Sequence, residues 1–221
     1  GNPDLNPEFT DSYEAGFLRM FEKGSFLGSV YYRHTNNVVQ RITLTDTTGL
    51  LRTLPVNLGT QDAYGIEMTM SYTINDWWRM NGSANAYYAN IQGAYEGVNY
   101  GTTLTTFTTN ITSIINLPKD IDFQASMRYR APRNTPQGRA LSVTVLDAGL
   151  SKDVLKGNGT LVLSVKDLFQ SGRRRSIIDT ETLYAESDFL WRARQFQLIF
   201  NYRINQKKKR GGGRPGGDGD N

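Results

Sequence analysis

The chain has 221 residues, of which 38% are hydrophobic and 11% aromatic, and this content excludes general disorder. It contains no cysteine, which excludes disulfides and thiolate metal sites, and a formal net charge of +4 is too small to indicate nucleic-acid binding. We expect neither a signal peptide nor a membrane helix, because no window approaches the roughly 18 consecutive apolar residues that a helix needs. A β-barrel stays compatible with this composition, because its alternating strands give no hydropathy peak.

Residues 1–9 contain two prolines and no hydrophobic periodicity, which predicts a lead-in loop. Beyond them, segments rich in β-forming residues alternate with turns rich in Gly, Asn, Asp and Pro. The pattern predicts an all-β fold of about nine antiparallel strands within residues 10–204. In chain order, the expected strands cover residues 10–21, 26–45, 59–74, 77–91, 102–117, 121–131, 140–155, 160–169 and 189–204.

The segment 121–131 alternates strictly, with apolar residues at odd positions and polar residues at even ones. Because successive side chains of a strand point to opposite faces, one face is wholly apolar. In a soluble β-sandwich that face would point inward, whereas in an outer-membrane barrel it would face lipid and the polar face would line the lumen. The apolar positions are Ile121, Phe123, Ala125, Met127, Tyr129 and Ala131.

The connections between the expected strands alternate in length. Short ones lie at 22–25, 75–76, 118–120 and 156–159, and longer ones at 46–56, 92–101, 132–139 and 170–188. Outer-membrane barrels sort their connections in this way, with short periplasmic turns and long extracellular loops, whereas Greek-key sandwiches have no reason to. The aromatic residues beside the short turns fit an interfacial girdle. They are Phe21, Phe26, Tyr72, Trp77 and Trp78.

Strand parity gives a second prediction. Complete bacterial barrels have an even number of strands, so nine strands that begin on the extracellular side indicate the C-terminal part of a larger barrel. Residues 1–9 would then be extracellular.

On the polar face, we expect acidic and basic side chains to pair across neighbouring strands. The charged residues expected to face the lumen are Glu67, Arg79, Asp122, Arg128 and Arg130.

Short motifs of a recognisable kind recur along the chain in a fixed order. They are Gly1-Asn2-Pro3-Asp4-Leu5-Asn6-Pro7-Glu8, Tyr13-Glu14, Tyr31-Tyr32-Arg33-His34-Thr35, Tyr64-Gly65-Ile66-Glu67, Gly149-Leu150-Ser151-Lys152, Asp167-Leu168-Phe169, Arg194-Gln195-Phe196 and Tyr202-Arg203-Ile204. Together they resemble the C-terminal barrel of TonB-dependent outer-membrane receptors, and more narrowly the outer-membrane β-barrel family of Bacteroidetes. The resemblance covers essentially the whole chain, including the Lys- and Gly-rich segment 205–221.

The resemblance implies a barrel of about 22 strands around an N-terminal plug. The plug, the remaining strands and a box that engages TonB would lie upstream of Gly1. The resemblance further implies ligand uptake at the bacterial outer membrane without a cofactor. The barrel would contact lipid and lipopolysaccharide, and residues 205–221 would form a flexible periplasmic tail. The outer-membrane assembly machinery would read the aromatic residues of the last strand. These residues are Phe196, Phe200 and Tyr202.

The long connections carry the candidate ligand-binding residues. Arg173, Arg174 and Arg175 suit the anionic groups of lipopolysaccharide or of an acidic ligand, since guanidinium groups form bidentate hydrogen bonds. The alternative is a solvated cluster that pairs with nearby acids. Loop tyrosines suit stacking on a sugar or peptide. They are Tyr95, Tyr100 and Tyr184.

No motif for catalysis appears, so we do not expect an enzyme. His34 is the only histidine, and without cysteines or placed carboxylates it indicates a structural role rather than a metal site. The main hypothesis is therefore a TonB-dependent receptor barrel. The alternatives are a barrel subunit of an outer-membrane assembly that transports nothing, and a soluble glycan-binding β-sandwich.

Overall fold

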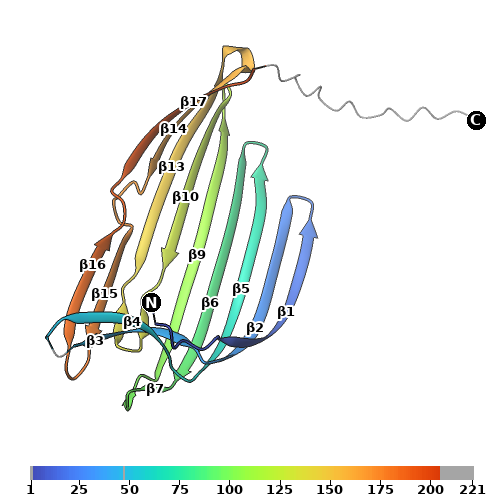
Figure 1. The fold of residues 1–221 in the computed structure, drawn as a ribbon. Coiled ribbons are helices and arrows are strands. Elements are labelled where there is room, and N and C mark those ends of the chain that lie inside the picture. The colour runs from blue at the N-terminus through green and yellow to red at the C-terminus, as the bar shows by residue number, and fades with distance from the viewer. Residues whose placement is uncertain (1, 47, 205–221) are drawn as a thin grey trace, which may run out of the picture.

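The computed structural model describes residues 2–46 and 48–204, in which every regular element is a strand except the short 3-10 helix Leu155–Gly157. No helix among these residues is long and apolar enough to cross a membrane. Nine strands form one antiparallel sheet in the order β1-β2-β5-β6-β9-β10-β13-β14-β17 (Figure 1). They are β1 Phe9–Phe21, β2 Gly24–Asn36, β5 Thr60–Asn75, β6 Trp78–Gln92, β9 Thr102–Leu117, β10 Ile121–Arg130, β13 Val143–Val154, β14 Gly159–Lys166 and β17 Gln195–Tyr202. The predicted nine-stranded antiparallel sheet is confirmed.

Eight shorter strands lie in the four long connections, all at the end of the sheet opposite the tight turns (Figure 1). Two of these connections are isolated hairpins, and the other two combine into one four-stranded sheet. The isolated hairpins are β3 Val39–Thr45 with β4 Leu51–Asn57, and β7 Ala94–Tyr95 with β8 Val98–Asn99. The four-stranded sheet contains β11 Arg133–Thr135, β12 Gly138–Ala140, β15 Arg173–Asp179 and β16 Tyr184–Leu190.

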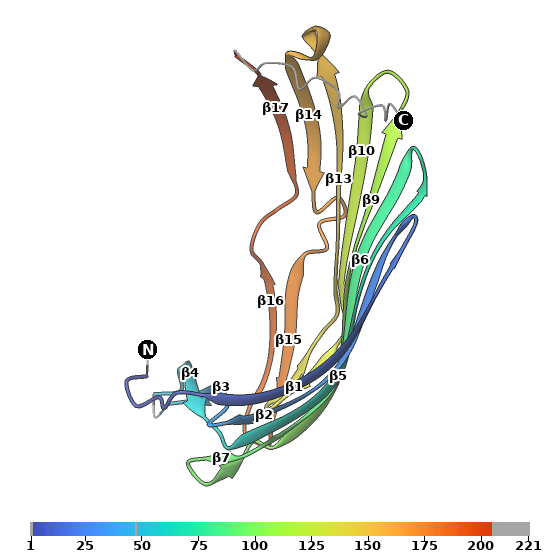
Figure 2. The ribbon, with the colours of Figure 1, turned by 90° about the vertical axis from the view of Figure 1, so that its right-hand side faces the viewer.

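Two sequence predictions were wrong in this region. The expected strand 26–45 breaks after Asn36, because Asn37 adopts a left-handed backbone with φ of 55° and β3 leaves the sheet to pair with β4. Asn is one of the few residues that adopt this conformation readily. The last strand of the sheet begins at Gln195 rather than at residue 189, because residues up to Leu190 belong to the β15–β16 hairpin of the preceding connection. This hairpin continues the direction of β14 and β17 beyond a kink (Figure 2).

The sheet curves along its length and across its strands, and the β3–β4 hairpin lies on its concave side (Figure 2). Within the described residues, the edge strands β1 and β17 each pair on one side only, so the sheet is open at both edges. The hairpin packs against Ala63 of β5, Ala89 of β6 and Leu104 of β9, which are neighbours across the sheet. In β5, Ala63 is on the face opposite to the apolar residues Ile66 and Met68. The concave face is therefore the polar one, and the apolar row faces outward.

Two rows of aromatic residues cross the outer face. Tyr13, Tyr32 and Tyr64 are direct neighbours in the register, with ring centroids 6.3 and 4.8 Å apart, at the end of the long connections. Near the tight turns, the rings of Phe21 and Tyr72 lie 6.0 Å apart. Tyr72 follows Tyr64 by eight residues in β5, roughly 26 Å of strand, or about 20 Å of height at the usual tilt. The interval is close to the apolar band of about 25 Å that barrels present to lipid.

Candidate functional site

The β3–β4 hairpin folds inward onto the polar face and forms the main buried cluster of the described residues. Ile42 and Val56 are 0% and 1% exposed, and they pack on side chains that β5, β6 and β9 direct to the concave side. Such burial fixes the hairpin to the inner wall rather than leaving it as a free loop. The cluster contains Val38, Ile42, Val56, Leu58, Ala63, Ala89, Ile91, Tyr100 and Leu104.

Hydrogen bonds hold this hairpin at its base and along its length. The amide side chain of Gln137, in the β11–β12 turn, accepts from the Thr43 backbone N–H at 2.7 Å and donates to its carbonyl oxygen at 2.8 Å. At the base, the Asn57 side chain donates to the Asn37 carbonyl at 2.7 Å. In the turn, the Thr48 hydroxyl and the Leu50 amide donate to Asp46 and lower the pKa of its carboxyl group. The hairpin thus joins the inner face of β5, β6 and β9 to the β11–β12 connection.

A cleft of about 850 Å³ opens where all four long connections meet. Its walls come from β3, the β7–β8 hairpin, the β11–β12 turn and the β15–β16 turn, and two carboxylates line it without any Lys or Arg from the described residues. Hydroxyl and amide groups make up most of the remaining polar lining. The lining residues are Thr43, Leu44, Thr45, Glu96, Val98, Asn99, Tyr100, Pro136, Gln137, Thr180, Glu181, Thr182 and Leu183.

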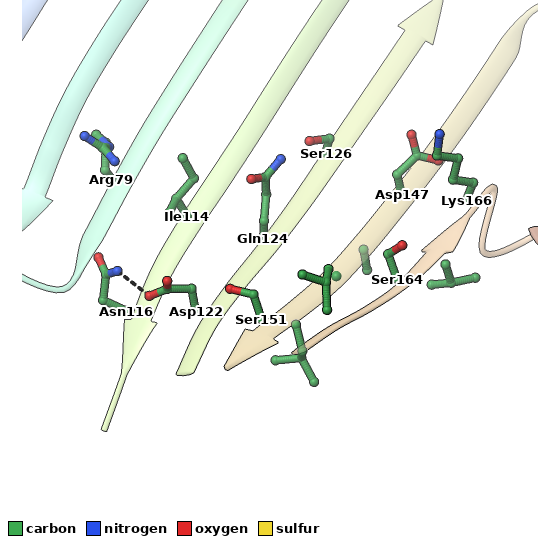
Figure 3. Close-up of a pocket in the computed structure, with 15 residues that line it drawn as sticks. Arg79, Ile114, Asn116, Asp122, Gln124, Ser126, Asp147, Ser151, Ser164 and Lys166 are labelled. Carbon is green, nitrogen blue, oxygen red and sulfur yellow. Dashed lines mark hydrogen bonds between the residues drawn. The ribbon is translucent and has the colours of Figure 1, made fainter. Parts of the chain in front are cut away.

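Further along the concave face, a second cavity of about 520 Å³ lies over β9, β10, β13 and β14 (Figure 3). Arg79, Asp122 and Lys166 provide charges of both signs around it, and the Asn116 amide donates to Asp122 at 2.6 Å. Gln124, Ser126, Asp147, Ser151 and Ser164 supply further polar groups. The concave face of the sheet is therefore hydrophilic around this cavity.

A third cavity of about 450 Å³ is lined by Arg128, Arg130 and Arg174. The Arg128 guanidinium donates to the Asp147 carboxylate at 3.1 Å, and Asp147 also lines the second cavity. This ion pair is one of the cross-strand pairs that the sequence led us to expect. Asp122 bonds to an amide rather than to an arginine.

Glu67 belongs to a polar network at a different place on the concave face. It accepts from the Asn85 amide at 2.8 Å and lies 3.9 Å from Arg33, whose guanidinium stacks 4.1 Å from the ring centroid of Tyr31. The Tyr31 ring covers Gly65 so closely that a Cβ at that glycine would overlap it. The network therefore joins β2, β5 and β6 through side chains as well as through the sheet.

The predicted ligand-binding residues do not form one group. Tyr100 lines the cleft but is only 6% exposed, so its ring is not free for stacking. Tyr95 is half-buried and packs against the buried cluster. Tyr184 is exposed, and its hydroxyl donates to Glu186, which raises the pKa of the phenol. The three arginines lie on β15 rather than in an irregular loop. Arg173 pairs with Asp188 at 3.2 Å, Arg174 lines the third cavity, and Arg175 lines none of these cavities.

His34 has a partner that the sequence did not reveal. Its Nδ1 lies 2.8 Å from Asp62, which also accepts from the Tyr32 hydroxyl at 2.7 Å. All three share the outer face near the end of β2 and β5 that carries the long connections. Over residues 2–46 and 48–204, no group of three or more His, Cys, Asp or Glu is placed to hold a metal ion.

The aromatic residues of the last strand share the outer face of β17. Phe196, Phe200 and Tyr202 pair with Val165, Leu161 and Gly159 of β14, and all three are exposed. Their reading by the assembly machinery stays a prediction. The expected tail, 205–221, lies outside the described residues.

Comparisons with known proteins agree with the all-β fold described above. Residues 1–202 are similar to the model of a family described as the outer membrane protein beta-barrel family. No curated protein matches the chain. Among solved structures, the copper transporter OprC is similar with a TM-score of 0.62 and 14% identity, over 90% of this chain and 32% of that one. The FrpB iron transporter from Neisseria meningitidis (F3-3 variant) is similar with a TM-score of 0.57 and 14% identity, over the same 90% and 32%. The chain thus spans about a third of the length of these transporters, and at this identity the likeness concerns the fold.

Proposed function

The chain belongs to the outer membrane protein beta-barrel family, and from this premise we propose that it forms the C-terminal part of the barrel of a TonB-dependent receptor. The family places the protein in the bacterial outer membrane. In the proposal, the rest of a barrel of about 22 strands, a plug and a TonB box come from upstream sequence. The open sheet and its coverage of 32% of two transporters support this reading.

The observation that carries the proposal is the arrangement of polar surfaces along the concave side. The cleft of about 850 Å³ among the long connections lies at one end, and two polar cavities follow along the inner wall. A ligand that enters between the connections would meet hydrophilic side chains throughout. The alternative of a soluble glycan-binding sandwich is wrong, because residues 1–202 match the outer membrane protein beta-barrel family.

The test is a growth assay in the native bacterium with the full-length protein. We expect deletion of the gene to abolish growth on at least one limiting nutrient, and removal of TonB function to abolish growth on the same nutrient. Thr45→Trp, which places a large ring at the wall of the cleft and narrows it, should fail to restore growth. Leu51→Trp is the matched control, because Leu51 is the cross-strand partner of Thr45 and does not line the cleft.

The opposite outcome identifies the rival function. If the deletion leaves growth on every nutrient unchanged but removes partner proteins from the outer-membrane fraction, then the protein is a subunit of an assembly and transports nothing. The protein level of both Trp variants in outer membranes must equal that of the wild type for the comparison to count.

A further inference from the structure

Three arginines from two distant segments of the chain converge on one cavity of the concave wall. Arg128 and Arg130 are two residues apart on β10 and therefore project from the same face of the strand. Arg174 comes from β15, more than forty residues later, and lines the same cavity of about 450 Å³. Thr108 and Asn110 of β9 add a hydroxyl and an amide to the lining.

The charge in this cavity is only partly balanced. Asp147 offsets Arg128 at 3.1 Å, and no carboxylate lines the cavity itself. Within residues 2–46 and 48–204, neither Arg130 nor Arg174 forms an ion pair. Arg173, the residue before Arg174, pairs with Asp188. Two guanidinium groups are thus available to a ligand.

Asp147 also fixes the position of the turn that leads to Arg174. Its second oxygen accepts from the Asp167 backbone N–H at 2.8 Å, and the Asp167 carboxylate in turn accepts from the backbone of Ser171 at 2.8 Å and of Gly172 at 2.9 Å. The Ser171 hydroxyl donates to the Thr144 carbonyl of β13 at 2.6 Å. The turn is therefore bonded to the wall on which Arg128 lies, and the arginines are brought together by built contacts.

We propose that this cavity is a lumenal subsite for a ligand that carries clustered anionic oxygens, either carboxylate or phosphate. Planar guanidinium groups bind both through paired hydrogen bonds, and several arginines in a partly enclosed site favour more than one negative charge. The inference rests on the proposed function, in which a ligand passes this wall. It differs from binding to lipopolysaccharide, because the cavity lies on the concave face and not toward lipid.

The experiment measures binding of citrate and of inorganic pyrophosphate to the purified full-length protein by isothermal titration calorimetry at constant ionic strength. The two probes separate carboxylate from phosphate recognition. We expect saturable binding of at least one probe, and a loss of affinity of about tenfold or more in Arg130→Gln and in Arg174→Gln, since each removes charged hydrogen bonds. Arg175→Gln is the matched control, because it removes the same charge from the opposite face of β15 and should leave affinity unchanged.

Three results would overturn the subsite. The first is that neither probe binds the wild type. The second is that Arg175→Gln weakens binding as much as Arg174→Gln, which indicates unspecific attraction. The third is that the Arg130 and Arg174 variants lower thermal stability without any probe binding, which indicates that an acidic segment of the same protein fills the cavity. The growth assay keeps the two proposals apart. Uptake without probe binding removes the subsite alone, and probe binding without uptake removes the transport function alone.

Discussion

Met127→Arg should lower the free energy of unfolding of the membrane-inserted protein by about 2–4 kcal/mol, the cost of an arginine near the bilayer midplane on a lipid-facing position. Met127 pairs with Ile111 on one side and Leu146 on the other, and all three side chains share the outer face. Ser126→Arg should change this free energy by less than about 0.5 kcal/mol, because Ser126 lines the polar cavity on the concave side.

Both variants are compared by urea unfolding of the full-length protein in lipid bilayers, with tryptophan fluorescence as the readout. Their adjacent positions on β10 make each the control for the other. Equal losses at both positions would contradict the assignment of the two faces.

Ile42→Ala should detach the β3–β4 hairpin from the inner wall at a cost of about 2–5 kcal/mol, the range for truncating a buried isoleucine. Ile42 is fully buried in the cluster that joins the hairpin to β5, β6 and β9. The main sheet should stay intact, because its own register does not involve the hairpin. Amide hydrogen exchange should therefore accelerate in β3 and β4 and stay unchanged in β9.

Leu51→Ala provides the control on the same hairpin, since Leu51 is 53% exposed and its truncation should cost less than about 0.5 kcal/mol. If Ile42→Ala leaves the exchange of the β3–β4 amides as slow as in the wild type, then the cluster does not hold the hairpin.

The sheet could be predicted from the sequence because its signals are local. Strict alternation in β10 gave the face of each residue, and turn residues such as Asn75 and Gly157 marked where strands reverse. The break at Asn37 was missed, because the β-forming residues Val38, Val39 and Ile42 directly beyond it read as a continuation of the same strand. The run Arg173 to Asp179 was missed as a strand because three charges in succession hide any alternation.

The candidate site depended on contacts that local patterns do not contain. The alternation of residues in β10 placed Arg128 and Arg130 on the polar face, but it gave no indication that the turn at Asp167 would bring Arg174 to the same cavity. The sequence also gave no indication that the β3–β4 hairpin folds inward. An apolar residue such as Ile42 has the same strand pattern whether it faces lipid or packs on the concave face of the sheet.

The central claim is that this chain forms a barrel wall with its apolar face toward lipid and its polar face toward the lumen. The most direct test introduces single cysteines at each position from 121 to 130 in the full-length protein, attaches spin labels, and measures their collision rates with oxygen and with a water-soluble nickel chelate in bilayers. Since the chain has no cysteine of its own, no background label arises from it. The account predicts a period of two, with oxygen favoured at odd positions and nickel at even ones. A reversed phase, or equal accessibility at neighbouring positions, would contradict it.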